Sequence, residues 1–141
     1  MQNFELDDMA DLERKPEVEG KTGTIVDLPR DRWIRVLAAS EHNPKWKAVA
    51  DEFNSGLRRL VAAEASRERL RLFCIPFYAN ALILEWGGIK SKGVEVPYGP
   101  EIGIFILRKY ADVYEAIDEV IWKHKNFRGQ RIQIIEDELK N

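Results

Sequence analysis

The segment Asn43-Pro44-Lys45-Trp46-Lys47-Ala48-Val49-Ala50-Asp51-Glu52-Phe53 decides the fold class, because it contains a complete helix start. Asn43 is a good N-cap, and Pro44 suits the first helical position, where a missing N–H breaks no hydrogen bond. The apolar side chains of this region then recur mostly at spacings of three and four: Trp46, Val49, Phe53, Leu57, Leu60 and Val61. This pattern predicts a long helix over residues 44–75, which Pro76 is expected to break or kink.

The segment that follows Pro76 predicts a second, buried helix. Residues 77–86 are apolar on nearly every side, and their length and their Ala and Leu content favour a helix over a strand. Gly87-Gly88 would end this helix, because glycine tolerates the left-handed conformation there. Four modest helices offer little surface to cover such a segment. We therefore expect the protein to form a homo-oligomer.

The flanking segments complete the predicted fold. Two stretches rich in β-branched and aromatic residues surround the turn-like segment at Pro29, which predicts a β-hairpin near residues 22–37. Pro100 and Glu101 open a third helix to about Tyr110, and the spacing of Asp112 and Glu115 is like that of a capping box before a fourth. The sequence therefore predicts a mainly α fold: a helical domain of about four helices with a small N-terminal β-hairpin.

Composition sets the domain organisation and the broad class of protein. The 141 residues, 45% hydrophobic and 33% charged, fit one globular domain, which we place at residues 21–128, and the net charge of −2 argues against nucleic-acid binding. Residues 1–20 hold seven acidic against two basic side chains. Either a frayed terminus or an arm that orders on a partner explains this segment. Residues 129–141 form a C-terminal tail. The apolar runs are too short for a membrane span, and the N-terminus lacks signal-peptide features.

The residue types that usually carry chemistry show no useful arrangement. His42 and His124 have no partner at metal-ligand spacing, and Cys74 lies in an apolar run that favours a packed, unreactive thiol. Neighbouring carboxylates are expected by chance in a chain with this charge content. The arginine-rich segment 58–71 has two open interpretations, a solvated helix face or a grip on an acidic partner or phosphates. We therefore expect no enzyme activity, no cofactor and no metal.

Aromatic residues are the stronger candidates for functional importance. Core packing is the default role of each of the four tryptophans, and tryptophan is also common at protein–protein contacts. We expect three side chains to serve helix packing or self-association: Trp46, Phe53 and Leu57. We expect three more to fix the loop that follows residue 86: Trp86, Pro97 and Tyr98.

Residues 30–128 contain an ordered series of motifs: Ala81-Leu82-Ile83-Leu84-Glu85-Trp86-Gly87-Gly88-Ile89, Gly93, Glu95-Val96-Pro97-Tyr98 and Pro100-Glu101. This series resembles the tail assembly chaperones of long-tailed bacteriophages. The spacing onward to Leu107, Tyr110 and the closing Asn126-Phe127 is also similar, and so is the upstream stretch from Trp33 to Leu37. Pro76 departs from the family pattern, in which this region often looks helical.

The resemblance implies a non-enzymatic assembly factor in the host bacterial cytoplasm. Such chaperones coat the tape measure protein, keep its apolar helices soluble and help to recruit the tail tube protein. Their task needs exposed apolar grooves and weak, multivalent binding. Two alternatives stay open: a structural virion component, such as a minor tail or head–tail connector protein, and a small enzyme built on scattered carboxylates.

Overall fold

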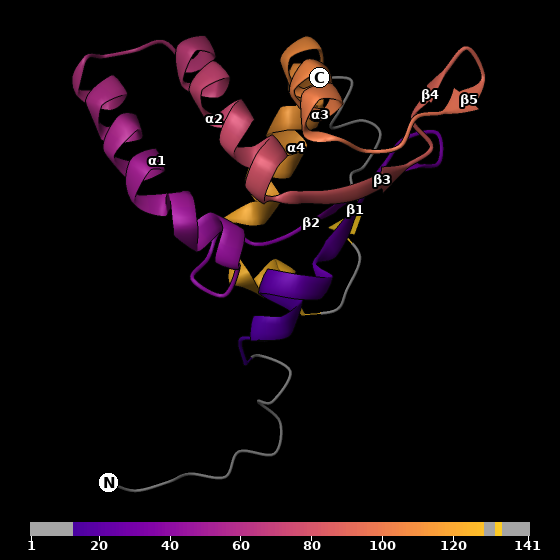
Figure 1. Ribbon diagram of the computed structural model, residues 1–141, viewed down its shortest axis with the longest axis horizontal. Coiled ribbons are helices and arrows are strands. Elements are labelled where there is room, and N and C mark those ends of the chain that lie inside the picture. Colours follow the sequence, from indigo (N-terminus) through magenta and orange to yellow (C-terminus); the bar gives the residue numbers. More distant parts are fainter. Residues whose placement is uncertain (1–12, 129–131, 134–141) are drawn as a thin grey trace, which may run out of the picture.

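The computed structural model describes residues 13–128 and 132–133. In this part of the chain, four α-helices pack with a small sheet built around the N-terminal strands (Figure 1). The mainly α prediction is confirmed. The core joins strand residues such as Val26 and Ile34 to helical residues such as Ile117 and Ile121.

The predicted β-hairpin is present and forms the middle of the sheet. Strand β1 (Thr24–Leu28) pairs antiparallel with β2 (Arg32–Val36) across a turn at residues 29–31. β2 pairs in turn with β3 (Ile83–Gly87), and the short β6 (Ile132–Gln133) lies parallel to β1, which gives the order β3-β2-β1-β6. A lone hairpin is marginal in water, and these two outer strands provide support that it needs.

Helix α1 (Pro44–Ala62) begins as the sequence predicts. The Asn43 side-chain oxygen accepts hydrogen bonds from the backbone N–H groups of Lys45 (3.1 Å) and Trp46 (3.3 Å). Its amide nitrogen donates to the carbonyl oxygens of Ala38 (3.1 Å) and Ala81 (3.0 Å). Asn43 is completely buried. Its side chain caps α1 and also links the start of this helix to Ala38, just after β2, and to Ala81, the last residue of the next helix.

The prediction of one continuous helix over residues 44–75 is wrong. α1 ends at Ala62, Glu64 adopts a left-handed conformation (φ 57°), and Ser66 caps a new helix, α2 (Arg67–Ala81). Pro76 lies inside α2 and does not end it. A proline in a helix interior costs roughly 3 kcal/mol. The buried neighbours Ile75 and Tyr78 supply packing energy that offsets this cost.

The helix predicted over residues 77–86 is also wrong. Residues 77–81 are the last turn of α2, and Ile83–Gly87 form β3. Leu82 and Trp86 are buried within the same chain, and Leu84 is the one large apolar side chain of the segment that is exposed. An apolar run with little periodicity fits a buried strand as well as a buried helix. The segment is therefore covered by its own fold, and it gives no reason for self-association.

The remaining elements follow β3 in order. A small hairpin of β4 (Lys90–Ser91) and β5 (Val94–Glu95) projects from the body, and α3 (Pro100–Lys109) and α4 (Ala111–Ile121) complete the helices (Figure 1). The predicted capping box is wrong: Tyr110 is the N-cap of α4, and Asp112 lies in its first turn. Phe127, which follows the short 3-10 helix His124–Asn126, is completely buried.

The described residues before β1 are held against the domain. The short π-helix Val18–Thr22 contains Glu19, which is completely buried and pairs with Arg14 (Nη2–Oε1, 2.6 Å). The carbonyl oxygen of Glu19 accepts a hydrogen bond from the N–H of Ala38, just beyond β2. Residues 1–12 of the predicted acidic arm lie outside the described residues, as does the predicted tail apart from β6.

Candidate partner-binding surface

An aromatic cluster joins α1 to α2 and contains two of the residues proposed for helix packing. Trp46 and Phe53 are buried, with ring centroids 4.8 Å apart. Phe53 also meets the rings of Phe73 at 5.7 Å and Phe77 at 5.2 Å, and the half-exposed Trp122 covers one side of the cluster. Trp46 and Phe53 thus hold the two helices together from inside. Leu57, one helical turn after Phe53, is only partly buried.

The second proposed set lies around the β4–β5 hairpin. The Trp86 indole N–H donates to the carbonyl oxygen of Val96 (2.7 Å), and the Tyr98 hydroxyl donates to the carbonyl oxygen of Ala79 at the end of α2. The two rings meet edge to face at 4.8 Å. Pro97, between them in the chain, is exposed. The structure therefore brings Trp86 and Tyr98 together at the base of the loop.

A first groove, the α1–α2 groove, opens between the N-terminal half of α1 and the C-terminal half of α2. Its volume is about 500 Å³, and its lining is Lys45, Ala48, Val49, Pro76, Phe77, Asn80 and Ala81. Most of these side chains are apolar, and the two polar ones are Lys45 and Asn80. The Asn80 amide is already engaged, because it donates to the carbonyl oxygen of Pro76 (2.8 Å). This groove offers an apolar surface between two helices.

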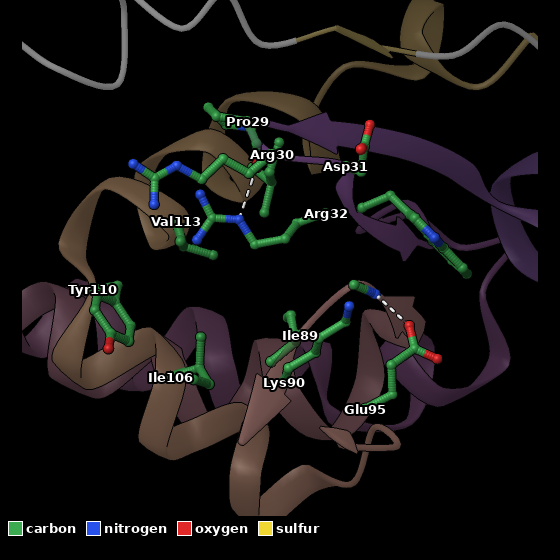
Figure 2. Close-up of a pocket in the computed structure, with 13 residues that line it drawn as sticks. Pro29, Arg30, Asp31, Arg32, Ile89, Lys90, Glu95, Ile106, Tyr110 and Val113 are labelled. Atoms are coloured by element: carbon green, nitrogen blue, oxygen red, sulfur yellow. Dashed lines mark hydrogen bonds between the residues drawn. The ribbon is translucent and has the colours of Figure 1, made fainter. Parts of the chain in front are cut away.

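A second groove, the mixed groove, lies where the β1–β2 turn faces the start of β4 and the α3–α4 junction (Figure 2). Its volume is about 740 Å³. Its apolar lining comes from distant parts of the chain: Leu28, Trp33, Ile89, Ile106, Tyr110 and Val113. Gly88 permits the close approach of these parts, because it has φ 76° and a Cβ there would lie 2.5 Å from the carbonyl oxygen of Asp31.

Charged side chains surround the apolar lining of the mixed groove. Arg30 comes from the hairpin turn, Arg32 from the start of β2 and Lys90 from β4, and Figure 2 shows these three side chains. Arg32 Nε donates to the carbonyl oxygen of Pro29 (2.7 Å), which fixes its direction. Within the described residues, none of these three cations forms an ion pair with a carboxylate.

Three cations and two carboxylates, Asp31 and Glu95, leave the mixed groove with a net charge of +1. Glu95 accepts a hydrogen bond from the backbone N–H of Gly88 (2.8 Å), and the Asp31 carboxylate points away from Lys90 in Figure 2. Arg30 (φ 65°) and Asp31 (φ 59°) both adopt the left-handed conformation. Residues in tight hairpin turns often adopt this conformation, so both φ values follow from the geometry of the β1–β2 turn.

The residue types considered for chemistry stay apart. Among residues 13–128 and 132–133, no group of three or more His, Cys, Asp or Glu side chains could hold a metal ion. Cys74 is buried as predicted, and burial raises the pKa of its thiol above the ordinary value, so the reactive thiolate is disfavoured. No helix in the described ranges has the length and apolar character of a membrane span.

The arginine-rich segment is partly used inside the fold. Arg71 Nη1 donates to the carbonyl oxygen of Leu107 (2.6 Å) at the end of α3, and the same guanidinium pairs with Glu68 (2.6 Å). Arg58, Arg59, Arg67 and Arg69 are exposed. Arg71 therefore joins α2 to α3, while the other four lie on the surface.

A family comparison identifies the origin of the chain. Residues 38–141 match the family model described as YdaY prophage protein, which is well over half of the chain. The chain belongs to the YdaY prophage protein family. The matched residues of this YdaY family member include all four α-helices, β3 and the α1–α2 groove. No curated protein and no solved structure matches the chain.

Sequence reasoning missed the mixed groove of this YdaY family member. Its lining comes from residues 28–33, 88–95 and 106–113, and their meeting depends on the β2–β3 pairing that the sequence did not reveal. One local signal was present: the turn Pro29-Arg30-Asp31-Arg32 concentrates charge between two apolar strands.

Proposed function

We propose that this prophage protein is a non-catalytic tail assembly chaperone that binds the tape measure protein in the host bacterial cytoplasm and aids tail tube assembly. The α1–α2 groove carries this proposal. It lies between α1 and α2, which run in opposite directions (Figure 1). Its lining is mostly apolar. An amphipathic helix binds such a groove through its apolar face.

Prophage membership and the resemblance of residues 30–128 to tail assembly chaperones support the choice of partner. An apolar helix of a tape measure protein would bury its side chains against Val49 and Phe77, with Lys45 at the rim. Trp46 and Phe53 would hold the groove walls in place from inside. The tail tube protein would meet the complex through surfaces that the groove leaves free.

A charge placed in the groove tests this function. Ala48 is exposed and lines the groove, so Ala48→Glu adds a carboxylate there without disturbing the core. Burial of this carboxylate costs several kcal/mol of hydration, which a pair with the exposed Lys45 at the rim offsets only in part, so we expect affinity for the tape measure protein to fall by about tenfold or more. Ala62→Glu makes the same change at an exposed position of α1 outside the groove, and should bind normally.

The measurement is the amount of soluble tape measure protein of the same prophage when it is produced together with each variant. Wild type and Ala62→Glu should keep it soluble, and Ala48→Glu should not. Equal solubility with all three would overturn the groove assignment. Insoluble tape measure protein with wild type would overturn the chaperone function. Stoichiometric recovery of the protein in mature particles would instead support the virion-component alternative.

A further inference from the structure

The mixed groove and the N-terminal sequence are complementary in charge and in apolar character. Residues 4–12, Phe-Glu-Leu-Asp-Asp-Met-Ala-Asp-Leu, contain four carboxylates and no basic side chain. Apolar residues alternate with them: Phe4, Leu6, Met9 and Leu12. The groove offers a matching set: three cations without ion pairs among the described residues, which outnumber the two carboxylates of its lining, and apolar side chains that include Ile89 and Ile106.

We propose that the mixed groove binds residues 4–12 of a second copy of this chain, so that the protein self-associates by exchanging its acidic N-terminal segment. Arg30, Arg32 and Lys90 pair with the carboxylates, and the apolar side chains of the segment pack on Ile89, Ile106 and Val113. A free phosphate or a nucleic-acid backbone would satisfy the cations but leave this apolar lining uncovered.

The position of the residues before β1 indicates that residues 4–12 bind the groove of a second copy and not the groove of their own copy. Arg14 is held on Glu19, whose backbone is bonded to Ala38 beyond the end of β2. The groove begins at the opposite end of the hairpin, at the turn around Arg30. Six residues of extended chain separate Arg32, which lines the groove, from Ala38, and this is about 20 Å at 3.3 Å per residue.

Residues 4–12 adjoin Glu13 directly, with no spacer between them. To reach the groove of its own copy, the chain would spend about six residues on crossing this length of the hairpin. Too few would then remain to fill the groove. A neighbouring copy has no such restriction, because its groove can approach the segment from outside.

Two charge reversals test the exchange in the full-length chain. Arg30→Glu with Lys90→Glu makes the groove acidic, and Asp7→Lys with Asp8→Lys brings the net charge of residues 4–12 from −4 to zero. The first variant places like charges across the contact and the second removes the attraction, so we expect each double variant to weaken self-association by about tenfold or more. Arg58→Glu with Arg59→Glu is the matched control, because both arginines are exposed on α1 outside the groove.

The measurement is the mass in sedimentation velocity runs over a range of protein concentrations, with circular dichroism to show that each variant is folded. Wild type and the control should gain mass as concentration rises, and the gain should shrink as salt is added. An equimolar mixture of the two double variants should associate again, because the unchanged groove of one variant then meets the unchanged acidic segment of the other.

Three outcomes would overturn the proposal. They are a wild type that stays monomeric at every concentration, a groove variant that associates like wild type, and a mixture that does not regain association when both variants have lost it. None of these depends on binding to the tape measure protein, so this proposal and the chaperone function fail separately.

Discussion

The rings of Trp86 and Tyr98 meet edge to face, with their centroids 4.8 Å apart, and each side chain also bonds to the backbone of another segment. Trp86 bonds to Val96, just after β5, and Tyr98 bonds to the last turn of α2 at Ala79. This pair links β3, the segment after β5 and α2. Val96 N–H also donates to the carbonyl oxygen of Ile89 (2.8 Å), which connects the pair to the lining of the mixed groove.

Tyr98→Phe should destabilise the protein by about 1–3 kcal/mol, because a largely buried carbonyl at Ala79 loses its donor. The ring and its contact with Trp86 remain. Tyr110→Phe makes the same chemical change at an exposed tyrosine, where we expect almost no effect. The free energy of unfolding in urea measures both. Equal stability of Tyr98→Phe and wild type would show that the hydroxyl contributes nothing.

The two side-chain helix caps should differ in their importance. Asn43 caps α1 while its amide also satisfies the carbonyls of Ala38 and Ala81, whereas the exposed Ser66 caps α2 with a single bond. We expect Asn43→Ala to cost about 3 kcal/mol or more, from a lost cap and two unpaired carbonyls, and Ser66→Ala about 1 kcal/mol. Thermal unfolding of the two variants checks this order. A larger loss at Ser66 would contradict it.

Gly56→Ala should destabilise the protein although alanine is the better helix former. A Cβ at Gly56 would lie 2.5 Å from Cζ of Phe73, so the α1–α2 contact would have to shift. Such overpacking costs roughly 1–3 kcal/mol, against a gain of about 1 kcal/mol in helix propensity. Ser55→Ala, at the exposed neighbouring position, should instead be neutral or slightly stabilising. Chemical denaturation that shows Gly56→Ala to be more stable than wild type would refute the close contact.

Glu19 should make stability depend on pH. Burial alone would raise the pKa of Glu19, but hydrogen bonds from Arg14 and Ser40 and the nearby charges of Arg14 and His42 bring that pKa below the ordinary 4.5. A carboxyl group with a lowered folded-state pKa stabilises the fold above its unfolded pKa, and this contribution is lost as the pH falls through the folded pKa.

Glu19→Gln should therefore be less stable than wild type at neutral pH, by about 1–3 kcal/mol, and the difference should shrink as the pH falls below 4.5. Glu17→Gln is the matched control, since Glu17 is exposed and its ion pair with Lys21 is long at 3.9 Å. That variant should match wild type at every pH. Denaturation at a series of pH values tests both. A difference that grows on acidification would mean that the fold raises the pKa of Glu19 instead of lowering it.

The sequence predicted the elements whose signals are local. Asn43 and Pro44 mark the start of α1, and Pro29 marks the hairpin turn, because each acts through its own backbone position. The sequence does not predict the break between α1 and α2 at Glu64, because a glutamate in the left-handed conformation does not change the spacing of the apolar residues. The apolar pattern predicts a helix over residues 77–86, because an apolar run with little periodicity fits either structure, and only the pairing of β3 with β2 decides between them.

The candidate surfaces were harder to predict than the fold. Each groove joins residues that are far apart in the sequence, such as Ala48 with Phe77, or Arg30 with Lys90 and Tyr110. Trp46 and Phe53 stood out as aromatic residues of a helical stripe, and the structure places them inside the α1–α2 contact. The sequence therefore indicates residues that support a groove from inside, such as Trp46 and Phe53, but not the residues that line it.

The parallel pairing of β6 with β1 matters for any shortened version of the chain. Ile132 and Gln133 lie beside Val26 and Asp27. Truncation after Arg128 would remove this cover and expose an unpaired strand border. Such borders recruit strands from other molecules and begin aggregation. A fragment that ends near residue 128 would therefore precipitate more readily than the whole chain, even though every helix is intact.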